Sequence, residues 1–227
     1  MSTVGVFENL IIITSIINVS SKPLDLFQSR SVYTAQERFD QTLETIESIR
    51  RRIPFACIVL IESSSINDVM EATFKERVDV YANISEIQFV QYAANEHLNK
   101  SLGEIIQLQY FFINHYDKLQ EMFDFRRLYK ISGRYFLNDY FDYDFTKNPF
   151  DMFVRLPDQH MISALYKIDD LVKYRKKLDE IYKRVAEDND SMEKALGSLY
   201  FRETFITCTR LGGMGCIAVA KDAVVEF

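Results

Sequence analysis

Residues 128–144 have the sequence LYKISGRYFLNDYFDYD, in which a short apolar run meets a group of polar side chains. Residues 128–131 have the length and composition of a buried strand, and a Ser-Gly pair breaks that pattern. Arg134 then stands where the carboxyl end of the strand is expected. Ligands of open parallel sheets bind in the crevice outside the carboxyl ends of the strands, so this stretch is a candidate binding site.

The side chains of this stretch suit an anionic ligand that carries hydroxyl groups. The Arg134 guanidinium offers a planar fork of N–H donors that matches phosphate oxygens, and the phenol of Tyr135 lies next to it. Carboxylates follow at Asp139, Asp142 and Asp144. A surface turn after a core strand, with Arg134 paired to a nearby Asp, is the alternative, and the residues alone leave both open.

The composition is typical of one α/β domain or two small ones. Of the 227 residues, 48% are hydrophobic, and Gly and Pro are scarce, so a sizeable core is expected and long linkers are not. The formal net charge is -6. A general nucleic-acid binder is normally basic, so no nucleic-acid partner is expected.

The cysteines and the apolar segments bear on the compartment. Cys57, Cys208 and Cys216 have no metal-like spacing, and an odd number of cysteines in a chain of this size argues against a disulfide framework. Cys57 and Cys208 lie in apolar runs and are expected in the core. A reducing, cytoplasmic location is therefore expected. No apolar segment has the length that spans a bilayer, so no membrane span is expected.

The first part of the chain is predicted to form a strand–helix–strand unit. Residues 10–17 and 55–61 are apolar runs rich in β-branched residues, which are typical of strands buried on both faces. Between them, Thr34 and Glu37 form a capping-box pattern ahead of a helix with an apolar stripe. This order predicts two parallel strands. Residues 78–81 are predicted to form a third strand.

A second capping-box pattern, Ser101 with Glu104, predicts a helix that extends toward Met122. Lys100 precedes its amino end, where free backbone N–H groups favour anions. An exposed lysine without a ligand is the alternative.

The carboxyl-terminal part is predicted to contain antiparallel strands. Residues 152–156 and 160–168 have strand patterns, and the linker between them is too short for a parallel crossover. Two helices are expected after residues 169–170 and 190–191. Residues 205–211 and 216–225 are predicted as late strands, and the glycine cluster between them is most simply a turn.

The order of these elements resembles that of GT-A glycosyltransferases. Several short motifs are also similar to those of small GT-A-like transferases from bacteria and large DNA viruses. These motifs are TSIIN (14–18), RS (30–31), ER (37–38), QT (41–42), IES (61–63), Lys100 with GE (103–104), and YKISGRY (129–135). They cover most of the chain as an ordered series, and SGRY is the most specific of them.

The resemblance implies a single GT-A-like (Rossmann-like) domain over residues 1–227, with a mixed α/β sheet flanked by helices. Residues 1–135, with the parallel strands, would bind the nucleotide, and residues 136–227, with antiparallel elements, would bind the acceptor. The implied reaction transfers a sugar from a nucleotide-sugar donor, UDP-linked, to a hydroxyl of a glycan acceptor. The alternatives are a nucleotidyltransferase of similar fold and a non-catalytic α/β interaction protein. The oligomeric state stays open.

The resemblance also implies a donor-binding site at the strand ends. Thr14, Ser15 and Glu62 would contact the nucleoside, because a carboxylate accepts hydrogen bonds from ribose hydroxyls or a base N–H. Arg30, Arg38 and Lys100 would face the diphosphate. The remaining residues of the implied site are Ser63, Ser132, Gly133, Arg134 and Tyr135.

The metal site departs from the pattern of the family. Many GT-A enzymes carry Asp-x-Asp directly after the fourth strand, where this chain has SGRY, and Asp142 and Asp144 come later. Either this displaced pair holds Mn²⁺ or Mg²⁺, or Arg134 supplies the positive charge in a metal-independent mechanism. A solvated acidic loop is the alternative for the aspartates.

The catalytic base is expected in the carboxyl-terminal half, on the acceptor side of the sugar. Glu193 lies early in a short helix beside apolar residues, which favours a position at a pocket wall, where partial burial would suit a general base. Asp139 is the second candidate. A first-turn glutamate favoured by the helix dipole is the alternative for Glu193.

Overall fold

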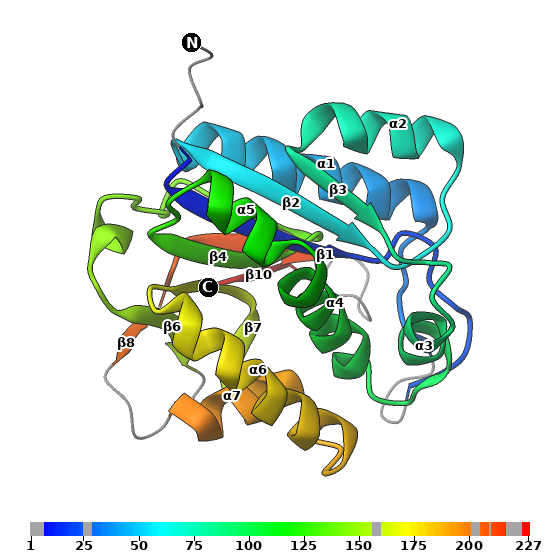
Figure 1. The fold of residues 1–227 in the computed structure, drawn as a ribbon. Helices are drawn as coiled ribbons and strands as arrows, with labels where there is room; N and C mark the ends of the chain where they lie inside the picture. The colour runs from blue at the N-terminus through cyan, green and yellow to red at the C-terminus, as the bar shows by residue number, and fades with distance from the viewer. Residues whose placement is uncertain (1–6, 25–28, 156–159, 201–204, 209, 217–223) are drawn as a thin grey trace.

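The computed structural model describes residues 7–24, 29–155, 160–200, 205–208, 210–216 and 224–227, and Figure 1 draws the other residues as a thin grey trace. The described strands form a seven-stranded sheet of order β3-β2-β1-β4-β7-β6-β8 and a three-stranded sheet of order β10-β9-β5. The strands of the larger sheet are β1 (Asn9–Ser15), β2 (Ala56–Glu62), β3 (Val80–Asn83), β4 (Arg127–Ser132), β6 (Asp151–Arg155), β7 (Met161–Ile168) and β8 (Phe205–Cys208). The strands of the smaller sheet are β5 (Tyr135–Leu137), β9 (Gly213–Cys216) and β10 (Val224–Glu226).

The predicted parallel half is confirmed. β1 pairs in parallel with β2 on one side and with β4 on the other, and β3 extends the sheet beyond β2. Every residue of β1 and β2 is buried, which explains their unbroken apolar runs. In this register Ser15 lies opposite Glu62, and Thr14 lies opposite Ser132. The strand ends that carry polar residues therefore share one edge of the sheet.

The predicted antiparallel strands are also confirmed. β7 runs antiparallel to both β4 and β6, while β8 returns parallel to β6. The fold class is thus the expected mixed α/β sheet flanked by helices, parallel in its amino-terminal half. The predicted linker 157–159, and residues 156, 209 and 217–223 of the predicted strands, lie outside the described residues.

Helices cover both faces of the larger sheet (Figure 1). Ile11 and Ile13 of β1 pack into a core with α1, whereas Leu10 and Ile12 pack into a second core with α4, α6 and α7. The alternation follows from the period of a strand, in which successive side chains point to opposite faces. The helices are α1 (Ala35–Arg52), α2 (Asp68–Arg77), α3 (Gln88–Gln91), α4 (Ser101–Asn114), α5 (Tyr116–Met122), α6 (Leu171–Ala186) and α7 (Met192–Tyr200). A π-helical turn (Tyr92–Glu96) follows α3, and a 3-10 turn (Phe145–Lys147) precedes β6.

The two predicted capping boxes have different outcomes. Thr34 caps α1 as expected: its hydroxyl accepts from the Glu37 N–H at 3.2 Å, and the Glu37 carboxylate accepts from the Thr34 N–H at 2.7 Å. The second box is wrong, because Ser101 is already the first residue of α4. Its hydroxyl accepts from the Met192 N–H of α7 at 3.0 Å, and Glu104 pairs with Lys130 instead. Both side chains therefore bond to residues of other elements instead of capping the helix.

The glycine cluster is a strand and not the predicted turn. Gly213–Cys216 forms β9, in which Gly215 pairs with Tyr135 of β5. A Cβ added to Gly215 would lie 2.3 Å from the carbonyl oxygen of Arg134, closer than any real contact. Only a glycine lets the two backbones approach this closely, and the approach holds β5 and the end of the SGRY motif in place.

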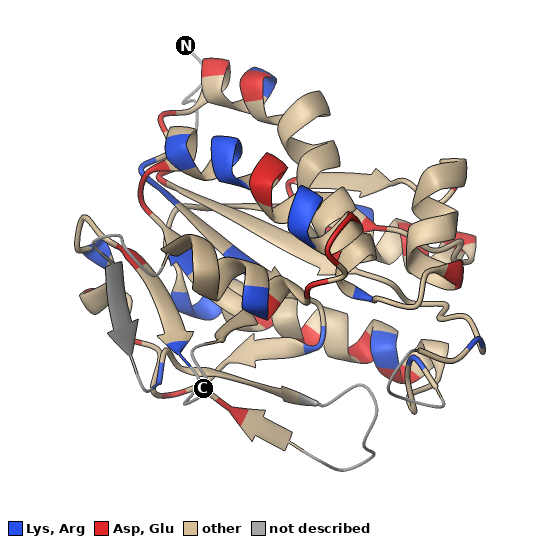
Figure 2. Cartoon of the chain, turned by 90° about the horizontal axis from the view of Figure 1, so that it is seen from below, with Lys and Arg blue, Asp and Glu red and all other residues tan. Residues whose placement is uncertain are grey.

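No helix in the described part of the chain has both the length and the apolar character needed to cross a bilayer. Figure 2 shows Lys, Arg, Asp and Glu interspersed along the helices when the molecule is seen from below.

We expect Gly215→Ala to lower the free energy of unfolding by about 1–3 kcal/mol, because the new methyl group overpacks the β5–β9 pairing. Gly103→Ala in α4 is the matched control, since the nearest atom to an added Cβ there is 3.4 Å away. Alanine in a helix is favoured over glycine by about 1 kcal/mol, so this control should be as stable as the wild type or more so. Urea denaturation measures both, and equal losses would contradict the packing argument.

Candidate functional site

A cavity of about 280 Å³ opens at the edge of the sheet where β1, β2 and β4 end. Most of the predicted site residues line it, although they come from distant parts of the sequence. They are Thr14, Ser15, Arg30, Arg38, Ser63, Lys100, Ser132, Gly133, Arg134, Tyr135 and Glu193. The parallel register accounts for much of this convergence, because it places the ends of neighbouring strands side by side.

The SGRY turn is held between β1 and α1. The Gly133 N–H donates to the Thr14 carbonyl at 2.9 Å, which continues the β1–β4 pairing by one step. The Thr42 hydroxyl of α1 donates to the Gly133 carbonyl at 2.8 Å. A Cβ at Gly133 would lie 2.9 Å from that hydroxyl oxygen, so the helix and the turn are in close contact. This contact fixes the backbone that presents Arg134 to the cavity.

Two of the arginines that line the cavity are buried. Arg38 lies in the first turn of α1, and its Nε donates to the Ile16 carbonyl at 2.6 Å. Arg30 donates to the Ala94 carbonyl at 3.2 Å and to the His97 carbonyl beside the π-helical turn. Arg30 and Arg38 are only 6% and 5% exposed, and neither forms an ion pair with a carboxylate in the described part of the chain. Backbone carbonyls are therefore the direct hydrogen-bond partners that hold both guanidinium groups.

Burial and a nearby cation both act on the charge of Arg38. Burial lowers the pKa of the Arg38 guanidinium and nearby Arg134 lowers it further, whereas Glu62 acts in the opposite direction. Both lowering effects disfavour the charged form of a side chain that normally stays protonated. An anion in the cavity would relieve them, so the charge distribution favours an anionic ligand.

Lys100 and Glu193 extend the charged lining toward the other face of the sheet. Lys100 stands directly before α4 and is exposed over part of its length. Burial of the amine lowers the pKa of Lys100, and the positive charges of Arg134 and Arg38 lower it as well. The negative charge of Glu193 raises the same pKa. Glu193 lies in the first turn of α7, is half-buried, and accepts a hydrogen bond from the Ser163 hydroxyl at 2.7 Å.

Glu62 is not part of the lining. It is fully buried at the end of β2, where its Oε1 accepts from the N–H groups of Ile17 and Ser64, at 3.1 and 2.8 Å, and from the Ser64 hydroxyl. The carboxylate thus joins the segment after β1 to the segment after β2. Its predicted contact with a nucleoside stays a prediction, and the structure gives it a supporting position behind Ser15 and Ser63.

Several polar residues around the cavity were not singled out from the sequence. Gln107 of α4 donates to the Ser15 carbonyl at 3.0 Å and to the Ser63 hydroxyl at 2.6 Å, which ties α4 to both strand ends. Lys130 is fully buried in β4, and Glu104 and Ser163 lie beside it. A lysine inside an apolar strand was the available signal, because a buried charge requires a partner.

Asp139, Asp142 and Asp144 are not brought to the cavity. Asp139 is exposed and pairs with Arg52 at the far end of α1. The Asp142 carboxylate accepts from the Phe145 N–H at 3.0 Å, and Asp144 pairs with Lys147 at 2.5 Å.

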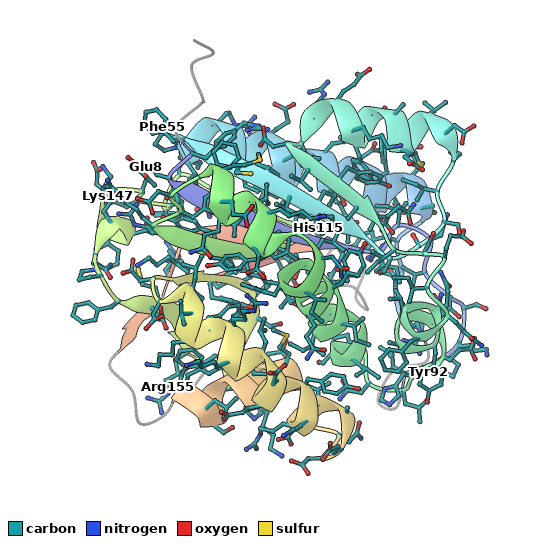
Figure 3. The ribbon with its side chains drawn as sticks, in the orientation of Figure 1. Glu8, Phe55, Tyr92, His115, Lys147 and Arg155 are labelled. Atoms are coloured by element: carbon teal, nitrogen blue, oxygen red, sulfur yellow. The ribbon has the colours of Figure 1, made fainter. Side chains whose placement is uncertain are left out.

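All three aspartates lie near the amino ends of the strands. Tyr143, between Asp142 and Asp144, accepts a hydrogen bond from Asn9 at the start of β1. Figure 3 shows Lys147 near Glu8 and Phe55, at the same edge. The length of β1 therefore separates the Asp-x-Asp pair from the cavity. In the described residues no three His, Cys, Asp or Glu side chains gather as a metal site would require.

No protein-family model matches the sequence, and no curated protein matches it. Solved structures that align with this chain include a nucleotide-diphospho-sugar transferase and two glycosyltransferases. A structure described as a nucleotide-diphospho-sugar transferase, from Desulfovibrio desulfuricans, is 10% identical, with a TM-score of 0.48 over 86% of this chain and 76% of that one. The glycosyltransferase GlyE of Streptococcus pneumoniae is 7% identical, with a TM-score of 0.48 over 88% of this chain and 44% of that one. A glycosyltransferase involved in the glycosylation of the major capsid of PBCV-1 is 7% identical, with a TM-score of 0.46 over 88% of this chain and 80% of that one. These likenesses concern the course of the backbone alone.

We expect Glu62→Ala to lower the free energy of unfolding by about 1–3 kcal/mol, because it leaves buried N–H donors without their acceptor. Glu62→Gln is the matched variant, since it keeps the acceptor Oε1 and removes the ionisable group. Urea denaturation at several pH values compares the two variants with the wild type.

The comparison should depend on pH. Burial raises the pKa of Glu62 in the folded protein. The folded wild type then keeps the Glu62 proton to a higher pH than the unfolded chain, so this contribution to stability is complete below the unfolded pKa and is lost as the pH rises through the folded one. The stability of Glu62→Gln relative to the wild type should therefore increase from acidic to neutral pH. A difference that does not change with pH would exclude the buried carboxyl as its cause.

Proposed function

We propose that the protein is a glycosyltransferase that moves a sugar from a nucleotide-sugar donor, UDP-linked, to a hydroxyl of a glycan acceptor. One observation carries the proposal: the lining of a cavity at the carboxyl edge of the sheet brings together cations, among them Arg38, Lys100 and Arg134, and carboxylates. Arg38 comes from α1, whereas Glu104 and Glu193 come from α4 and α7 on the opposite face. A ligand with an anionic part and a hydroxyl-rich part matches this division.

The diphosphate is assigned to the arginine side of the cavity. Arg38 and Arg134 repel one another there, and a phosphate oxygen between them would convert that repulsion into two charge-assisted contacts. Lys100 and Arg30 add positive charge around the same space. The nucleoside is assigned to the strand ends at Thr14, Ser15 and Ser63, with Glu62 supporting them from behind.

The chemical step requires a base and a stabilised leaving group. Glu193 is proposed to take the proton of the acceptor hydroxyl as the hydroxyl oxygen bonds to the anomeric carbon. The bond from that carbon to the donor phosphate oxygen breaks at the same time, and the electron pair leaves with the nucleoside diphosphate. Arg134 is proposed to neutralise the charge that develops on the leaving group. The Ser163 hydroxyl, which donates to Glu193, holds the carboxylate in position.

We assign to Arg134 the positive charge that neutralises the leaving group. The alternative was a metal ion held by Asp142 and Asp144, but these aspartates lie at the opposite edge of the sheet. We expect Arg134→Ala to abolish transfer and to weaken binding of nucleoside diphosphate. Arg134→Lys should rescue only part of the activity, since lysine lacks the bidentate fork. Arg51→Ala, at an exposed position on α1, is the control and should behave as the wild type.

Calorimetry with UDP, CDP and GDP measures binding, and release of nucleoside diphosphate measures turnover. Wild-type activity that persists in chelator, together with its loss in Arg134→Ala, is the expected pattern. Activity that disappears in chelator but survives in Arg134→Ala would assign the charge to a metal instead. Release of pyrophosphate in place of nucleoside diphosphate would indicate nucleotidyl transfer, and a protein that binds no nucleotide would be an interaction protein.

Glu193→Gln keeps the shape of the side chain and removes its basicity. We expect it to leave donor binding unchanged and to lower turnover by about a hundredfold or more, the usual contribution of a general base. Glu187→Gln, at an exposed position after α6, is the control. Near-normal turnover in Glu193→Gln, measured by release of nucleoside diphosphate, would exclude Glu193 as the base.

A further inference from the structure

A buried ammonium group organises the wall of the cavity beyond the arginines. Lys130 is 0% exposed in the middle of β4. Its Nζ donates to Glu104, to the Ser132 hydroxyl at 2.8 Å and to the Ser163 carbonyl at 2.7 Å. A lysine ammonium has three N–H donors, so all of them are used by protein groups. Because α4, β4 and β7 supply the three partners, Lys130 holds these elements in one arrangement.

The Lys130 network leaves one carboxylate oxygen of Glu104 without a partner. Its Oε1 receives the Lys130 ammonium, and within the described residues no hydrogen bond reaches Oε2. The Glu104 side chain is 22% exposed and lines the cavity. The carboxylate is therefore anchored through one oxygen and available through the other.

Glu193 is anchored in the same way and in the same place. Its Oε1 accepts from the Ser163 hydroxyl, while the Ser163 carbonyl accepts from Lys130. Both carboxylates are thus connected to Ser163, and Glu193 also acts electrostatically on Lys130 and Lys100. Glu104 and Glu193 are both half-buried, and all donors of Lys130 are used within the protein. These three side chains therefore present hydrogen-bond acceptors, and no donors, to the cavity.

We propose that Glu104, positioned by Lys130, makes the donor-sugar part of the cavity specific for uncharged sugars and excludes sugar acids. This inference rests on the proposed function and adds the class of sugar. Ionised carboxylates only accept hydrogen bonds, so they match the hydroxyl groups of a neutral sugar. A sugar carboxylate has no hydrogen to offer and adds like charge at short range, where the interior dielectric screens it poorly.

The neighbouring cations are assigned to another part of the donor. All donors of Lys130 are already used, so it has none for a sugar carboxylate. Arg134 acts on Arg38, Lys100 and Lys130, so its charge reaches this wall as well as α1. The proposed function places Arg134, Arg38 and Lys100 around the diphosphate of the same donor, whose negative charge they would neutralise. With the diphosphate bound, a sugar acid would add its charge beside the Glu104 carboxylate.

The test uses two donors that differ only at one carbon: UDP-glucose and UDP-glucuronic acid. Calorimetry or competition against UDP gives their affinities, and the ratio of the two reports the selection. We expect the wild type to bind UDP-glucose at least tenfold more tightly than UDP-glucuronic acid. Glu104→Gln should reduce that ratio at least tenfold and leave the affinity for UDP unchanged, because UDP has no sugar.

Glu104→Gln leaves the buried Lys130 without its counter-charge, which can destabilise the fold. The double variant Glu104→Gln with Lys130→Met removes both charges and serves as the second test, with the same loss of selection expected. Glu76→Gln, at an exposed position on α2, is the control and should keep the wild-type ratio. If the nucleotide screen selects guanosine, GDP-mannose and GDP-mannuronic acid form the matched pair.

The outcomes separate this inference from the proposed function. Equal wild-type affinity for the two sugars, or an unchanged ratio in both variants, overturns the role of Glu104 while UDP binding still supports the donor site. A fall in UDP affinity equal to the fall in UDP-glucose affinity would show that Glu104 acts on the whole site rather than on the sugar. Absence of binding by every nucleoside diphosphate overturns both proposals together.

Discussion

The parallel pairing of β1 with β2 and β4 is the constraint on which the site depends. In its register Ser15 stands opposite Glu62 and Thr14 opposite Ser132, so three separate segments end at one edge of the sheet. Gly133 then extends the pairing through its hydrogen bond to Thr14. A shift of one residue in either pair would turn these side chains to the other face, because the period of a strand is two.

The lining of the site combines positive and negative side chains. Backbone carbonyls hold two of the arginines, as in the contacts of Arg38 with Ile16 and of Arg30 with Ala94. Lys130 and Ser163 hold the carboxylates of Glu104 and Glu193. Partners within the protein thus fix these four charged groups, which is the condition for electrostatic preorganisation. Arg30 and Arg38 are buried and form no ion pair within the described residues, so an anionic ligand would supply the partner they lack.

Particular residues show how far sequence reasoning reached. The SGRY motif predicted a strand end with Arg134, and the apolar runs predicted buried parallel strands, because both signals are local. The capping box at Thr34 was predicted correctly for the same reason. The capping box predicted at Ser101 was wrong, because the Ser101 hydroxyl accepts a hydrogen bond from the distant Met192 N–H. The glycine cluster was misassigned to a turn, since its close contact with β5 involves a partner far away in the sequence.

The sequence by itself determined the mixed sheet and the parallel pairing of its first two strands, which follow from hydrophobic period and chain connectivity. The polar residues after the apolar runs marked the strand ends, and the resemblance to a known family added Arg30, Arg38 and Lys100, which line the cavity. The tertiary structure decided the functional partners: Lys130 with Glu104, Ser163 with Glu193, and the separation of Asp142 and Asp144 from the cavity. Such pairings depend on which elements pack together in space, and no local pattern encodes the distance between two side chains that are far apart in the chain.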